Sequence, residues 1–216
     1  RLPKSMGVEP GQIQVLSATR RGECGTVNLN RALQAALNPP ARSKRQKQWG
    51  DMTFRVGDRV MQTRNNHDVL WEKEDGSGGS GIFNGDVGTI KEIDLQQERL
   101  TVLFDDREAD YDFTQLGELE QAYAVTVHKS QGSEYPVVIM PIAGGAPQLM
   151  TRNLLYTAVT RAREQVIMLG SSKCIYDMVD NNQIRRRYSA LKCLLMELDT
   201  IVLNGRNHGP TDRDDT

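Results

Sequence analysis

Residues 122–134 read Ala-Tyr-Ala-Val-Thr-Val-His-Lys-Ser-Gln-Gly-Ser-Glu, an apolar run that turns polar at His128. The apolar part predicts a buried strand. The small and polar residues that follow let the backbone approach a ligand closely at Gly132. A second segment of this kind, Tyr156-Thr-Ala-Val-Thr-Arg-Ala-Arg163, begins 22 residues after Glu134. We therefore expect both segments to present polar side chains at the rim of a sheet, where α/β proteins bind nucleotides.

Two more apolar runs, residues 137–142 and 165–169, predict further strands. Between them, residues 148–162 are predicted to be helical from the spacing of Met150, Leu154, Leu155 and Val159. Strands that alternate with helices indicate an α/β fold with a parallel sheet and with ligands at the carboxyl ends of its strands. Arg161 and Arg163 fall near the predicted helix end. A guanidinium fixed there suits a phosphate, because its planar fork donates several charge-assisted hydrogen bonds and keeps its proton.

At these residues the chain resembles the superfamily 1 DNA helicases, and more closely the RecD-like family (RecD2, RecD/TraA and the exodeoxyribonuclease V alpha chain). Residues 124–138 are similar to helicase motif V with its extension, and residues 155–163 are similar to motif VI. Residues 15–25, followed by 29–34 and 37–40, are similar to the segment that opens the second motor domain, although Ala18 stands where proline is expected. Together these matches cover almost the whole chain.

The resemblance implies a RecA-like lobe of the P-loop NTPase type, the second motor lobe (domain 2A) of an ATP-dependent DNA helicase that moves 5′ to 3′. In that family two such lobes close on ATP, while single-stranded DNA crosses the top of both. By position, Arg161 would be the arginine finger that stabilises charge on the transferring γ-phosphoryl group. Such a group contributes about three to five decades in rate.

The resemblance also implies roles for other residues. Gln131 and Gly132 would lie against the phosphates, and Glu134 would bind the ribose hydroxyl. Contacts to the DNA backbone or a base are implied for Thr126, His128 and Ser130, and Arg20 and Arg21 are candidates for further phosphate contacts.

A P-loop is absent from the sequence. Its phosphate-binding turn needs glycine followed by lysine and then serine or threonine, and no glycine here is followed by lysine. We therefore expect a carboxyl-terminal fragment that does not hydrolyse ATP alone, with ATP and Mg²⁺ held mainly by the N-terminal lobe of the same parent chain. The alternative is a non-catalytic DNA-binding or protein-docking module with a helicase-derived fold. Arg161 together with Glu134 favours the motor.

Composition sets further limits. The chain has 216 residues and a net charge of −1, so any DNA contact must come from local clusters such as residues 42–47 and 185–187, which are equally compatible with solvated surfaces. Three distant cysteines have no zinc or redox spacing, no metal site is predicted, and His67 and His208 are given no role. No apolar run is long enough to span a membrane, and we expect a cytoplasmic protein.

The sequence pattern changes between residues 58 and 113. Short alternating runs at 59–63, 86–93, 99–104 and 108–113 predict strands separated by turns. The family implies that they form an SH3-like β-barrel (domain 2B) inserted into the motor lobe. The expected domains are residues 1–57 with 114–203 for the lobe, 58–113 for the barrel and 204–216 for a flexible tail.

The barrel has two candidate roles. It is either a structural insert or a clamp on the DNA strand that uses Arg64, Asn65, Asn66 and an exposed Trp71, since base stacking on an aromatic ring contributes about 1–3 kcal/mol. Residues 76–81, Gly-Ser-Gly-Gly-Ser-Gly, predict a flexible loop, native or engineered.

Four further elements are predicted. The first strand is expected at 12–17, followed by a helix at 26–37 whose apolar face carries Leu29, Leu33 and Leu37. Ser171 or Ser172 could cap a short helix that runs to Asp180. An amphipathic helix is expected at 184–198, with its apolar stripe packed against this lobe or the missing first lobe.

Overall fold

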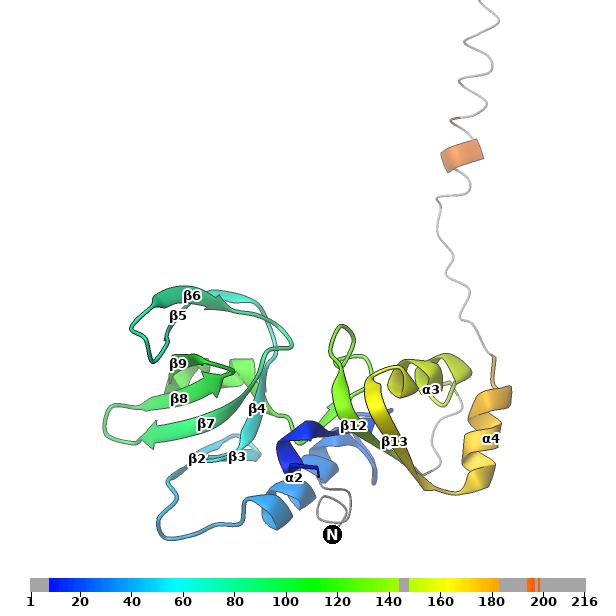
Figure 1. Ribbon diagram of the computed structural model, residues 1–216, viewed down its shortest axis with the longest axis horizontal. Helices are drawn as coiled ribbons and strands as arrows, with labels where there is room; N and C mark the ends of the chain where they lie inside the picture. Colours follow the sequence, from blue (N-terminus) through cyan, green and yellow to red (C-terminus); the bar gives the residue numbers. More distant parts are fainter. Residues whose placement is uncertain (1–7, 144–147, 183–193, 197, 199–216) are drawn as a thin grey trace, which may run out of the picture. The chain divides into compact units, whose positions relative to one another are not determined.

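The computed structural model describes residues 8–143, 148–182, 194–196 and 198 (Figure 1). The chain divides into two units, residues 1–182 and 183–216. In the second unit residues 194–196 and 198 are helical. The rest of the helix predicted at 184–198, the cluster at 185–187 and the predicted tail lie outside the described residues. All that follows concerns the first unit.

A parallel sheet forms the lobe, as predicted (Figure 1). Its strands are β1 (Ile13–Ser17), β11 (Ala124–Thr126), β12 (Tyr135–Ile142) and β13 (Ala162–Gly170), in the order β11-β1-β12-β13. The short helix η1 (Pro10–Gln12) precedes β1. The long apolar run of β12 reflects its position in the sheet, because it pairs with a strand on each side.

Three helices connect or follow these strands: α2 (Thr26–Leu37), α3 (Arg152–Val159) and α4 (Ser172–Asp180). Side chains of α3 and α4 pack in one hydrophobic cluster with β12, as Leu155 and Met178 do with Met140. Ser171 occupies the N-cap position of α4, although its side chain makes no capping hydrogen bond.

The helix predicted at 148–162 was too long at both ends. It begins after Thr151, whose hydroxyl accepts a hydrogen bond from the backbone N–H of Leu154 at 3.3 Å. It ends before Ala162, because the backbone there already pairs with Tyr135 of β12. Arg161 therefore lies in a turn, and Arg163 lies on a strand.

The buried face of α2 is polar, which the sequence pattern did not predict. Asn30, Gln34 and Asn38 are each less than a tenth exposed, whereas Leu37 is 55% exposed. The reason is that the three amides hydrogen-bond to the barrel and to the strand that leaves it. The predicted leucine face instead helps line an apolar groove beside the first residues of β1.

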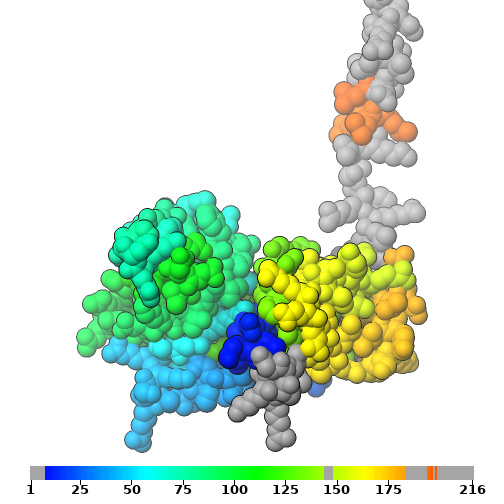
Figure 2. Space-filling model, in the orientation of Figure 1, coloured from blue at the N-terminus to red at the C-terminus, as the bar shows by residue number. Residues whose placement is uncertain are grey.

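The second part of the fold is the SH3-like barrel. Its antiparallel sheet has the order β10-β4-β7-β8-β9-β5-β6, and a separate hairpin, β2-β3, packs against its core. Figure 2 shows the light-blue surface of the segment that includes this hairpin directly beside the green surface of the barrel. The elements are β2 (Gln46–Trp49), β3 (Met52–Arg55), β4 (Arg59–Gln62), β5 (Asn66–Glu72), β6 (Gly78–Ile82), β7 (Val87–Asp94), β8 (Arg99–Phe104), β9 (Arg107–Asp112), η2 (Phe113–Glu118) and β10 (Leu119–Gln121).

The barrel core takes in Phe54, Leu116 and Leu119, which lie outside 58–113. The boundaries at 58 and 113 stay a prediction. The four strands predicted inside them are confirmed as β4, β7, β8 and β9. β8 has the predicted ends, and the ends of the other three differ by at most one residue.

The prediction of a flexible loop at 76–81 was wrong, because most of it belongs to β6 and pairs with β5. Gly79 lies opposite Trp71, and a Cβ atom on Gly79 would come within 2.5 Å of the indole ring. β6 therefore has glycine at this position instead of an apolar residue, because the indole ring of Trp71 fills the space that a side chain would need.

Candidate functional site

The residues predicted to bind ligands divide between two opposite edges of the parallel sheet. Thr126 pairs with Ser17, and these residues end β11 and β1 at the carboxyl edge. Tyr135 pairs with Ala162, and these residues begin β12 and β13 at the amino edge. The register separates the two edges by about 20 Å of strand. Residues 127–134 connect one edge to the other.

Arg161 and Glu134 directly precede β13 and β12, so both lie at the amino edge. The expectation that these two residues lie at the carboxyl ends of the strands was therefore wrong. Local patterns do not record the direction in which each segment enters a sheet. Arg20, Arg21 and His128 follow carboxyl ends, as expected.

Arg161 joins the two helicase-like segments at the amino edge. Its backbone carbonyl accepts a hydrogen bond from the N–H of Tyr135 at 2.8 Å. Its Nη1 donates to the carbonyl of Ser133 at 3.2 Å, and its Nη2 donates to Thr160 Oγ1 at 3.3 Å. The buried Nε has no partner among the described residues. The guanidinium is thus held in place by neutral oxygens, and no carboxylate in the described part of the chain pairs with it.

Glu134 pairs with Arg163 across the same edge, with Oε2 and Nε 3.0 Å apart. Both side chains are more than half exposed, so the pair is weak and open to exchange. Gln131 and Gly132 are exposed in the turn before Glu134. Gly132 has φ +88° and open space where a Cβ would stand, so its backbone is accessible to a ligand.

At the carboxyl edge, His128 is exposed and Thr126 is half-buried, with its Oγ1 accepting a hydrogen bond from the N–H of Lys129 at 3.3 Å. Ser130 differs from the prediction. Its side chain is fully buried, and its hydroxyl donates to the carbonyl of Val127 at 2.8 Å. A direct contact between Ser130 and DNA does not fit this geometry, whereas a role in fixing the turn does.

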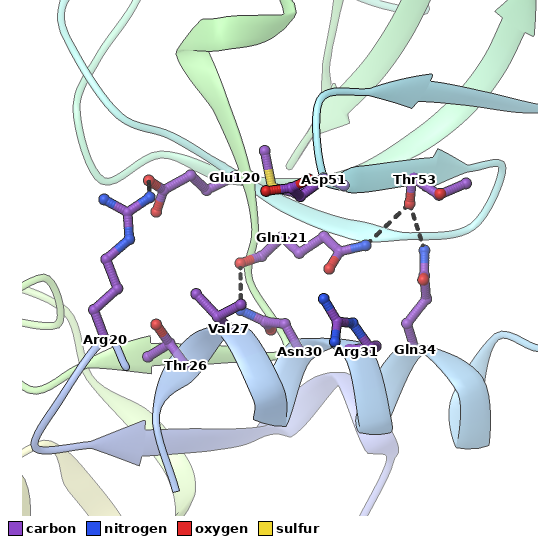
Figure 3. A pocket seen from close by; sticks show the side chains of 11 residues that line it. Arg20, Thr26, Val27, Asn30, Arg31, Gln34, Asp51, Thr53, Glu120 and Gln121 are labelled. Carbon is purple, nitrogen blue, oxygen red and sulfur yellow. Dashed lines mark hydrogen bonds and ion pairs between the residues drawn. The ribbon is translucent and has the colours of Figure 1, made fainter. Parts of the chain in front are cut away.

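Glu120 of β10 lies between two cations of the carboxyl edge. Arg20 Nη2 is 3.2 Å from Glu120 Oε1 (Figure 3), and Lys129 Nζ is 2.7 Å from Glu120 Oε2. Arg21 is exposed. Lys129 was missed by sequence reasoning although it stands between His128 and Ser130 in the motif V segment.

The barrel contributes a cluster that we name the barrel tip: Arg64, Asn65, His67, Phe83 and Asn84. Arg64 pairs with Glu118 at 2.8 Å, and Asn65 accepts a hydrogen bond from the N–H of Asn84 at 3.0 Å. Phe83 is 42% exposed and meets the ring of His67 edge to face, with centroids 5.4 Å apart. Sequence reasoning missed these two rings, because only strand pairing brings them together.

Glu118 anchors the barrel tip. It is 5% exposed and accepts hydrogen bonds from Gln62, Arg64 and Asn66. Burial alone would raise the pKa of Glu118, but the three hydrogen bonds outweigh burial and hold that pKa below its usual range.

The exposed Trp71 of the sequence prediction is not found. Trp71 is half-buried against the barrel core, with Lys73 Nζ 5.9 Å and the guanidinium of Arg107 5.8 Å from its ring centroid. The indole ring already contacts these two cations of the barrel, so Trp71 is a poor candidate for base stacking.

Family comparisons match both parts of the fold. The model for the SH3 domain of ATP-dependent RecD-like DNA helicases matches residues 29–104, and the model for the UvrD-like helicase C-terminal domain matches residues 121–169. An ATP-dependent RecD2 DNA helicase of Deinococcus radiodurans is 36% identical over 163 residues, which cover 76% of this chain and 21% of that protein. This chain belongs to the RecD-like helicases.

Another member of the RecD-like family is similar over the same region. The RecD subunit of the RecBCD enzyme of Mycobacterium tuberculosis is 30% identical over 172 residues, which cover 80% of this chain and 27% of that protein. The chain thus spans about a fifth to a quarter of the length of these relatives. A solved structure of two coordinating Pif1 helicases at forked double-stranded DNA covers 93% of this RecD-like chain and 46% of its own, at 16% identity and a TM-score of 0.49.

In the described part of this RecD-like chain, no cluster of histidine, cysteine or carboxylate side chains could hold a metal ion. None of the helices described is long and apolar enough to cross a bilayer.

Proposed function

We propose that this chain is the second motor lobe of a longer ATP-dependent DNA helicase that moves 5′ to 3′. The observation that carries the proposal is the convergence of the two helicase-like segments at one edge. Arg161 bonds through its backbone to Tyr135 and through its guanidinium to Ser133. The two segments therefore form one surface, with a fixed cation beside an exposed turn.

Arg161 would act there as the arginine finger. Its two Nη contacts, at 3.2 and 3.3 Å, are to neutral oxygens. Charge-assisted bonds to a phosphoryl group are shorter and stronger, so a nucleotide can replace them without first breaking an ion pair. A preorganised cation stabilises charge that develops in the transition state more than charge already present in bound ATP.

The remaining nucleotide contacts would come from the turn beside Arg161. Gln131 and Gly132 are exposed and would face the phosphates. Glu134 would accept a hydrogen bond from the ribose hydroxyl in place of its ion pair with Arg163, which is exposed and weak. ATP and Mg²⁺ would be held mainly by the N-terminal lobe, since the sequence offers no Gly-Lys pair for a P-loop.

Single-stranded DNA would cross the opposite, carboxyl edge. Thr126, His128, Arg20 and Arg21 lie there, and Lys129 joins them as a cation. From this edge, β10 leads to the barrel tip, because Glu120 contacts Arg20 and Glu118, two residues earlier, contacts Arg64.

The rest of the barrel is unsuited to phosphates. Residues 58–113 hold 14 acidic and six basic side chains. Such a surface repels a nucleic acid backbone. We therefore limit the proposed clamp to the barrel tip, where Arg64 and Asn65 stand beside the exposed ring of Phe83.

The test is the ATPase activity of the full-length protein with Arg161→Ala, and with Arg163→Ala as the matched control two residues away. Arg161→Ala should lower kcat at least about a hundredfold and leave the Kd for single-stranded DNA within about twofold. Arg163→Ala should change kcat less than about threefold, because it removes only an exposed pair.

A near-normal kcat for Arg161→Ala would refute the arginine-finger role. Arg161→Lys should rescue little, since a point charge does not reproduce the planar fork.

A further inference from the structure

The side chain of Glu120 forms ion pairs with two cations, Arg20 and Lys129. Its side chain is 31% exposed and lies at one end of a cleft of about 130 Å³ between α2 and the barrel (Figure 3). Arg20 comes from the loop after β1, and Lys129 comes from the turn after β11. Three separate segments thus meet at a single carboxylate.

Glu118, two residues earlier, shows what a structural carboxylate looks like in the same region. It is almost fully buried and accepts hydrogen bonds from two amide side chains as well as from Arg64. Removing its charge would leave those groups without an acceptor. Glu120 has no such neutral partners in the described structure; its side-chain contacts are the ion pairs with Arg20 and Lys129.

A carboxylate held by an arginine and a lysine occupies the position that a phosphate would take. Partly exposed ion pairs of this kind contribute little stability, so a phosphodiester can displace them. Arg20 and Lys129 lie at the same carboxyl edge as His128, where DNA is proposed to bind, and they can pair either with Glu120 or with the phosphates of the DNA strand.

We propose that Glu120 is an internal counterion that competes with DNA phosphates for Arg20 and Lys129, and so sets the affinity of this lobe for single-stranded DNA. The inference rests on the proposed path of DNA along the carboxyl edge. Since Glu120 belongs to β10, the strand that leaves the barrel, binding of DNA would also release a contact between barrel and lobe.

The experiment measures binding of a fluorescein-labelled oligo-dT to the full-length protein without nucleotide, by fluorescence anisotropy. Glu120→Gln should bind about three- to tenfold tighter at low salt, and the gain should shrink as salt screens the charges. Glu74→Gln, which removes an exposed carboxylate from the turn between β5 and β6, should leave Kd unchanged within about 1.5-fold. Glu120→Asp keeps the charge on a shorter side chain and should fall between wild type and Glu120→Gln.

Arg20→Gln and Lys129→Gln separate this inference from the function on which it rests. Both should weaken binding, and in the double variant Arg20→Gln/Lys129→Gln the addition of Glu120→Gln should bring no gain. If neither cation variant weakens binding, the proposed DNA path is wrong, and the counterion role is wrong with it. If the cations matter but Glu120→Gln binds no tighter than Glu74→Gln, the path stands and the counterion role is overturned. A loss of affinity in both Glu120→Gln and Glu120→Asp would also overturn it.

Discussion

Gln34 Nε2 donates a hydrogen bond of 2.6 Å to Asp58 Oδ2, which joins a helix of the lobe to a fully buried carboxylate at the start of the barrel. The same carboxylate accepts hydrogen bonds from Asn38 at 2.7 Å, from the Tyr123 hydroxyl at 2.9 Å and from the backbone N–H of Arg55 at 2.8 Å. The chain before the barrel, the barrel and the chain after it all meet at Asp58.

Asp58→Ala should therefore lower the free energy of unfolding by about 2–4 kcal/mol, because it leaves several buried donors without an acceptor. Urea denaturation followed by tryptophan fluorescence measures this change. Asp68→Ala, which removes an exposed carboxylate from β5, should change stability by less than about 0.5 kcal/mol. Equal effects of the two substitutions would show that the Asp58 network contributes nothing specific.

Tyr123 and Tyr111 should make the fold sensitive to alkaline pH. Burial, with the nearby charge of Asp58, raises the pKa of Tyr123, and burial, with the charge of Glu118, raises the pKa of Tyr111. Their stabilising contribution is complete below the unfolded-state pKa of about 10 and is lost as pH rises above it, at up to about 1.4 kcal/mol per pH unit for each tyrosine.

Urea denaturation between about pH 9 and pH 11 checks this dependence. Tyr123→Phe and Tyr111→Phe should each reduce the slope of unfolding free energy against pH in this range. Tyr156→Phe is the control, because Tyr156 is 69% exposed. A slope that depends on none of the three tyrosines would contradict the prediction.

Phe83→Ala should weaken binding of single-stranded DNA by the full-length protein about fivefold to a hundredfold, if a base stacks on its exposed ring. Leu70→Ala is the control, since Leu70 is 72% exposed on the same barrel but is not aromatic and lies outside the barrel tip. Equal affinities for both variants would remove the barrel tip from the DNA path. Deletion of residues 58–113 is a poorer test, because it would also strip Asp58 from its buried donors.

The isolated chain should show no DNA-stimulated ATP hydrolysis above a buffer blank, because the sequence lacks the Gly-Lys pair of a P-loop. A coupled-enzyme assay with oligo-dT measures this rate. Turnover that survives repeated purification of the chain would overturn its assignment as half of a motor.

The sequence predicted the elements whose burial follows from the order of apolar and polar residues within the element itself. The run 137–142 predicted the core of β12, and alternation predicted β7 and β8, because β8 buries every second side chain and β7 does so as far as Ile90. By contrast, β6 was missed because Gly79 makes room for Trp71 instead of supplying an apolar side chain. The buried face of α2 was also missed, since its amides are satisfied by residues up to 94 positions away.

The sequence named candidate site residues but not their arrangement. Arg161 and Glu134 were predicted from the resemblance to helicase motifs, and their roles stay a prediction, whereas their place at the amino edge depends on the direction of β12 and β13 in the sheet. The pairs Arg20–Glu120 and Arg64–Glu118 join residues 100 and 54 positions apart, so no local window contains them.

The segment 127–134 crosses from one edge of the sheet to the other, and Ser130 is locked at its middle. On the proposed function, His128 would contact DNA and Glu134 would contact the nucleotide, and the two residues lie six positions apart on this segment. A movement of the segment about Ser130 would then shift both residues together. DNA translocation and ATP hydrolysis would be coupled through this backbone, without a relay through distant side chains.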